Sequence, residues 1–147
     1  MRRREFLGGL GCVSLLRSRA AVAQSGRTFH LGTLTPIVPI TAASPGGKIL
    51  IKVLGERGFN LGQNLTVEPL GGCGVVEKHP SLVSELKSKG VDAVVIIGYP
   101  TAMASKAAGI PTVAASGIGD PVETKLIESL AHPGGTITGI SDVAATL

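Results

Sequence analysis

The sequence contains no tryptophan, and aromatic residues make up only 3% of the chain. Val, Ile, Leu and Ala side chains must therefore fill its interior. Enzyme signatures are also missing. No Gly-x-Gly-x-x-Gly follows the first predicted strand, and neither a Gly-Lys-Ser/Thr phosphate loop nor a Gly-x-Ser-x-Gly motif occurs. His30, His79 and His132 lie far apart without metal-ligand spacing. We therefore expect no enzyme activity, no cofactor and no metal.

The first 23 residues have the three-part layout of a secretory signal. A basic head, Arg2–Arg4, precedes an apolar run from Phe6 to Leu16, and Ala21–Ala23 forms a small-x-small cleavage pattern. The apolar run is shorter than the roughly 20 residues that a membrane-spanning helix needs. Residues 3–7 match the twin-arginine pattern R-R-x-F-L, and an ordinary secretory signal is the alternative. We expect export to the periplasm with cleavage after Ala23.

Removal of this leader changes the charge of the chain. The full sequence has 14 Lys and Arg against 10 Asp and Glu, a net charge of +4. The leader holds five arginines and one glutamate, which leaves 14 − 5 = 9 basic and 10 − 1 = 9 acidic residues. A neutral chain without a basic stripe does not favour a nucleic-acid partner. The remaining 147 − 23 = 124 residues correspond to one domain.

Cysteine is scarce, with Cys12 in the leader and Cys73 beyond it. A single cysteine after cleavage cannot form an internal disulfide. We interpret Cys73 as a free or buried thiol, with a reactive thiol in the Gly-rich stretch Pro69–Gly74 as the alternative.

Strand-like and helix-like segments alternate along the chain after the leader. Helix signals include Ser44-Pro45 as a cap followed by proline, and Asp120-Pro121 with a predicted core stripe of Val122, Leu126, Ile127 and Leu130. Such alternation predicts an α/β fold with a doubly wound parallel sheet, a single Rossmann-like lobe. The predicted strands are 28–35, 65–68, 91–97, 110–115 and 136–140, with helices from 45, 82, 100 and 121 and a loop at Pro69–Gly74.

Ligands of open parallel sheets bind beyond the carboxyl ends of the strands. Predicted helix starts after 98 and 120 would favour an anionic group such as a carboxylate. Hydroxyl groups and one carboxylate at these loops could direct hydrogen bonds to a ligand. The alternatives are that the hydroxyls only satisfy turns, that the aspartate only caps a helix, and that the tyrosine only packs. The candidate ligand-binding residues are Thr35, Tyr99, Thr101, Ser116 and Asp120.

Five motifs follow one another along the chain: V-D-A-V-V at 91–95, G-Y-P-T-A at 98–102, I-P-T-V at 110–113, G-D-P-V at 119–122 and L-A-H-P-G-G-T-I-T-G at 130–139. In this order they resemble the family of ABC-transporter substrate-binding proteins, the two-lobed type I receptors. The family order Gly-Thr-Pro-Ala is altered here, because Tyr99 precedes Pro100 and Thr101 follows it.

This resemblance implies a Venus-flytrap receptor that captures a small polar solute, with amino acids among the candidates, and delivers it to a membrane permease. We expect residues 24–147 to form the N-terminal lobe only, truncated before a second lobe. A non-functional fragment of such a receptor is one alternative. A small exported α/β enzyme that uses Cys73 or Asp120 is the other.

Overall fold

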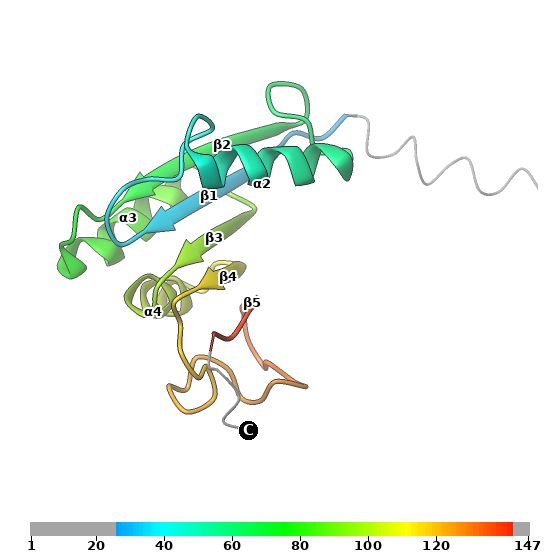
Figure 1. Cartoon of the computed structure of the whole chain (residues 1–147). Coiled ribbons are helices and arrows are strands. Elements are labelled where there is room, and N and C mark those ends of the chain that lie inside the picture. Colours follow the sequence, from blue (N-terminus) through cyan, green and yellow to red (C-terminus); the bar gives the residue numbers. More distant parts are fainter. Residues whose placement is uncertain (1–25, 143–147) are drawn as a thin grey trace, which may run out of the picture.

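The computed structural model describes residues 26–142, so the predicted leader and its cleavage site lie outside the described residues. The fold is a single sheet in which all paired strands are parallel, in the order β2-β1-β3-β4-β5 (Figure 1). This confirms the predicted α/β class. The strands are β1 (Phe29–Thr35), β2 (Leu65–Gly71), β3 (Ala93–Ile97), β4 (Thr112–Ser116) and β5 (Ile137–Gly139).

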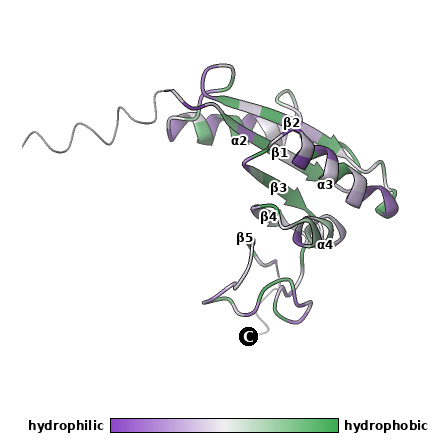
Figure 2. Cartoon of the chain, turned by 180° about the vertical axis from the view of Figure 1, so that it is seen from behind, coloured by the Kyte–Doolittle hydropathy of each residue, from purple (hydrophilic) through white to green (hydrophobic). Residues whose placement is uncertain are grey.

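The helices cover both faces of the sheet. The chain leaves β1 toward β2 in one direction and then runs from β3 to β5 in the other. Right-handed crossovers therefore place α2 (Pro45–Glu56) on one face, and α3 (His79–Ser88) and α4 (Tyr99–Ala108) on the other. Figure 1 shows α2 in front of β1. Figure 2 views the molecule from behind and shows α3 on the opposite face of the sheet. A short 3-10 helix, η1 (Val76–Lys78), precedes α3.

Local chemistry sets the start of α2, as the sequence indicated, and also the end of α4. The Ser44 hydroxyl accepts a hydrogen bond from the Gly47 N–H at 3.2 Å, and Pro45 begins α2. Gly109 ends α4 in the left-handed conformation, with φ 67°. The exposed apolar residues Ile49 and Val53 show that α2 is only half buried on its face of the sheet.

The main core lies between the sheet and the pair α3 and α4. Its fully buried members include Leu34, Leu86, Val94 and Ile96. A Cβ at Gly32 would lie 3.1 Å from the Leu86 methyl groups, so this glycine lets α3 approach β1 closely. In β3 the buried residues alternate with half-buried ones. One face of this strand is therefore fully buried, and the other is half-buried.

The predicted loop Pro69–Gly74 is wrong in its first half, because β2 continues to Gly71. Pro69 lies opposite Thr33 in the register of β1 and β2. The strand tolerates proline here because β2 is at the edge of the sheet, where the missing N–H removes no necessary ladder bond.

The helix predicted from Asp120 is also wrong. The Asp120 carboxylate does accept hydrogen bonds from the N–H groups of Val122 and Glu123, at 2.8 and 3.0 Å. Residues 121–130 nevertheless form a series of turns, and Lys125 adopts φ 57°. So short a helix needs a buried apolar face to be stable. Of the predicted stripe, Leu126 is buried while Leu130 is 73% exposed.

Candidate functional site

The carboxyl ends of β1 and β3 form the switch point of the sheet, where the strand order reverses. Main-chain hydrogen bonds of 2.8 to 3.0 Å join residues 72–74, after β2, to residues 35–37, after β1. The two loops therefore form one continuous surface at this edge.

Gly98 brings the loops after β1, β3 and β4 together. A Cβ at Gly98 would lie 2.9 Å from Cγ of Pro36, and its φ of 92° favours glycine. The Gly98 N–H donates to the Ser116 carbonyl at 2.9 Å. On the other side, a Cβ at Gly117 would lie 3.2 Å from the Gly98 main chain. Four successive strand ends thus contribute to a single edge.

Two of the predicted ligand residues are turned inward at this edge. Thr35 is buried, and its hydroxyl donates to the Val38 carbonyl at 2.6 Å. Thr101 is fully buried, and its hydroxyl lies 2.7 Å from the carbonyl oxygens of both Ile97 and Gly98. These hydroxyl groups hold the shape of the loops. Direct contact of either with a ligand stays a prediction.

The other three predicted residues reach the surface. Ser116 is exposed at the end of β4. Asp120 uses Oδ1 for its two main-chain bonds, and Oδ2 accepts no hydrogen bond from the described residues. Tyr99 is the first residue of α4, and its half-exposed ring lines a groove with Val76 and Met103. The structure thus brings all five predicted residues to one edge, three of them at its surface.

Only one of the two predicted helix starts exists here. Helix α4 begins directly after Gly98, and no side chain caps its first turn. Its N–H groups and dipole therefore favour an anionic group at this point. The loop after β4 leads into turns instead.

Sequence reasoning missed Asp142, which binds the loop after β4. Its carboxylate accepts hydrogen bonds from three consecutive N–H groups, those of Gly117 at 2.9 Å, Ile118 at 3.2 Å and Gly119 at 3.1 Å. The Gly117 N–H above all, with the N–H groups of its neighbours, lowers the pKa of Asp142 below its ordinary value of 3.8. No local pattern signals this contact, because more than 20 positions separate the partners.

We expect Asp142→Ala to release this loop. In the variant, the amides of residues 117–119 lose their shared acceptor and should exchange with solvent much faster than in the parent chain. Hydrogen exchange measured by NMR checks this. Since the pKa is lowered in the folded chain, protection should be complete above the ordinary carboxyl pKa and disappear as the pH falls through the lowered value. Exchange rates unchanged in Asp142→Ala would contradict the contact.

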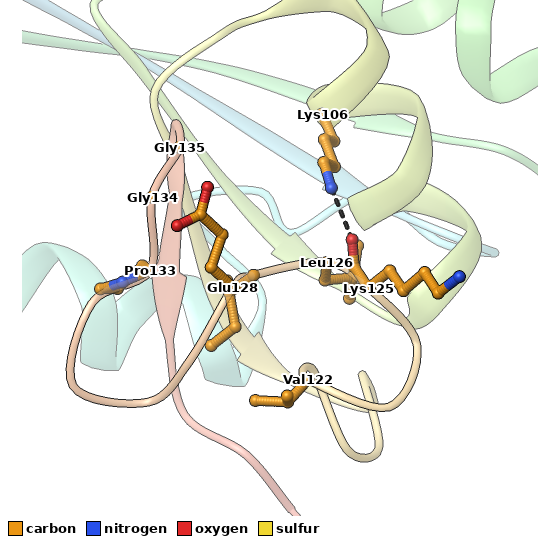
Figure 3. A pocket seen from close by; sticks show the side chains of 9 residues that line it. Lys106, Val122, Lys125, Leu126, Glu128, Pro133, Gly134 and Gly135 are labelled. Atoms are coloured by element: carbon orange, nitrogen blue, oxygen red, sulfur yellow. Dashed lines mark hydrogen bonds between the residues drawn. The ribbon is translucent and has the colours of Figure 1, made fainter.

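A cavity with a volume of about 460 Å³ lies at the opposite, amino edge of the sheet. Figure 3 shows the Lys106 ammonium group directed at the Lys125 carbonyl, with the Glu128 carboxylate beside Gly134 and Gly135. Its position is on the wrong side of the sheet for a strand-end site. The carboxyl edge remains the candidate.

Among residues 26–142, no helix is long and apolar enough to cross a membrane. In the same part of the chain, no cluster of three or more His, Cys, Asp or Glu side chains is placed to hold a metal ion.

This doubly wound sheet has the fold of one lobe of a solved substrate-binding protein, of which it covers 40%. The family model described as ABC transporter substrate binding protein matches residues 35–146. The chain therefore belongs to the family of ABC transporter substrate-binding proteins, as its motifs predicted.

Relatives of known name agree with this assignment. A tyrosine-binding protein of Clostridioides difficile (strain R20291) is 32% identical over 97 residues, which are 65% of this chain and 28% of the relative. A conserved domain protein of Vibrio cholerae matches in structure with a TM-score of 0.68 and 27% identity, over 81% of this chain and 40% of the other. An ABC domain in complex with L-Trp from Streptococcus pneumonia matches with a TM-score of 0.63 and 27% identity, over 79% and 39%. The chain thus spans well under half the length of these relatives.

Proposed function

We propose that this chain captures a small polar solute, outside the cytoplasm, for an ABC importer. The observation that carries the proposal is the convergence of four strand-end loops on Gly98 and its neighbours, at the switch point of the sheet. In this role residues 1–23 act as the export signal, a membrane permease receives the solute, and neither catalysis nor nucleic-acid binding takes part.

The chemistry of the edge supports an amino acid as the solute. The uncapped start of α4 offers N–H groups to a carboxylate, and Oδ2 of Asp120 can accept from an amino group. Ser116 adds an exposed hydroxyl. The named relatives support aromatic amino acids in particular, since one binds tyrosine by name and another was solved with L-Trp.

We expect L-tyrosine or L-tryptophan to raise the melting temperature of the purified chain. A ligand at 100 times its Kd stabilises the folded state by about 2.7 kcal/mol, which corresponds to roughly 10 °C for a domain of this size. A thermal-shift series over the twenty amino acids measures the effect. No shift with any of them would contradict the proposal.

Asp120→Asn is the matched variant for this test. The amide oxygen can still accept the Val122 and Glu123 N–H bonds, so the loop keeps its shape, while the charge that faces the solute amine is lost. The variant should melt like the parent without ligand and show a smaller ligand-induced shift.

An enzyme function gains no support from the thiol. Cys73 is exposed, and its thiol donates a hydrogen bond to the Gly71 carbonyl at 3.9 Å. A nucleophilic cysteine needs a base or a cation beside it.

A further inference from the structure

An apolar groove begins at the starts of α3 and α4, at the edge of the candidate site, and runs along α4 as far as Ala107 in its last turn. Its volume is about 440 Å³. Aliphatic, proline, methionine and tyrosine side chains form most of the wall, and no Lys, Arg, Asp or Glu contributes to it. The lining residues are Val76, His79, Pro80, Tyr99, Pro100, Met103, Ala104 and Ala107.

His79 is the one buried polar side chain of this wall. The sequence predicted this helix only from residue 82, but the structure makes His79 the first residue of α3, only 1% exposed. Neither ring nitrogen has a hydrogen-bond partner among the described residues. Its Nε2 faces Gly72, where a Cβ would lie only 2.4 Å away. Burying an unpaired imidazole is costly, so a partner that reaches it gains affinity.

The composition of the wall restricts what this groove can hold. Without charged residues, the wall excludes carboxylate and ammonium groups, which must stay at the solvated edge. The Tyr99 ring and the Met103 thioether favour an aromatic partner. A neutral imidazole offers one donor and one acceptor, so it can pair with a hydroxyl or a ring N–H.

We propose that this groove binds the aromatic ring of the solute, and that His79 pairs with the single polar atom of that ring, a phenol hydroxyl or an indole N–H. Nε2 faces Gly72 in the structure, so this pairing requires the imidazole to turn about its Cβ–Cγ bond toward the groove. This subsite rests on the proposed function, because the charged end of the same solute then lies at Asp120 and the start of α4.

The pair p-cresol and toluene tests the subsite, since the two molecules differ by the hydroxyl alone. We expect the parent chain to bind p-cresol about tenfold more tightly than toluene. In His79→Leu this preference should fall to about one, with toluene binding retained. His132→Leu is the matched control, because His132 is exposed and does not line the groove. Titrations followed by the NMR signal of the Met103 methyl group give both affinities.

A second readout covers the case in which His79→Leu fails to fold. The 15N resonances of the His79 ring in the parent chain should shift on addition of p-cresol and stay unchanged with toluene. Equal affinity for both probes, or ring resonances that ignore p-cresol, would overturn the subsite and leave the imidazole paired with water alone. If L-tyrosine still stabilises the chain in that case, the receptor function survives without this subsite. If p-cresol is preferred but no amino acid binds, the receptor function fails and the groove stands.

Discussion

Gly47→Ala is expected to destabilise the folded chain by about 1–3 kcal/mol. An added Cβ would lie 1.9 Å from the Thr41 carbonyl oxygen, a main-chain atom that cannot move without its loop. Such overpacking costs about 1–3 kcal/mol. The shift would also break the Ser44 cap on the Gly47 N–H, which is worth about 1 kcal/mol. The better helix propensity of alanine offsets about 1 kcal/mol of the sum.

Gly46→Ala is the matched control for this prediction. Gly46 lies in the same helical turn, but a Cβ there would meet only Cγ2 of Ile40 at 4.0 Å. Removing a glycine from a helix should then stabilise the chain by about 0.5–1 kcal/mol. Urea unfolding of both variants measures the two effects. A Gly47→Ala variant as stable as Gly46→Ala would show that the loop does not pack against α2 as described.

The same contact matters for the candidate site, because residues 36–44 form the surface of the edge beside the switch point. The Thr33 hydroxyl donates to the Ile40 carbonyl at 3.2 Å, and the Thr35 hydroxyl to the Val38 carbonyl at 2.6 Å. The far end of this loop packs at Thr41 against Gly47 of α2. A Gly47→Ala variant that still folds should therefore lose solute-induced stabilisation as well.

The sequence predicted most elements because their signals are local. Ser44-Pro45 and Gly109 act through cap geometry within a few residues, and they mark the start of α2 and the end of α4. The five predicted strands all form, and the parallel pairing of β1 to β4 follows from their alternation with helices. The location of the site at the carboxyl edge is a consequence of that topology.

The remaining features depend on contacts between distant residues. Pro69 continues a strand because β2 happens to lie at the sheet edge, which the sequence of β2 alone does not reveal. The inward turn of Thr101, the Asp142 contact with residues 117–119, and the burial of His79 all arise from packing. Polarity alone could not separate the hydroxyl groups that hold loops from those that face solvent.

The failure of the predicted helix at 121–130 leads to the second large effect, in the pair Leu126→Ala and Leu130→Ala. Leu126 is 3% exposed and belongs to the core cluster, whereas Leu130 is 73% exposed. Truncating a buried leucine costs about 2–5 kcal/mol, and a site at the margin of the core should fall at about 2–3. The exposed leucine should cost no more than about 0.5 kcal/mol.

This pair separates the turns of the structure from the helix that the sequence favours, because a helix would bury both leucines on one stripe. Chemical unfolding at constant pH gives the two differences in free energy, and far-ultraviolet circular dichroism reports whether either variant changes helix content. Comparable losses of about 2 kcal/mol or more in both variants would restore the helix over residues 121–130. A large loss in Leu126→Ala alone would show that this one side chain anchors the segment. Leu126 belongs to the same core cluster as Ala114 of β4 and Ile137 of β5, while the backbone turns at Lys125.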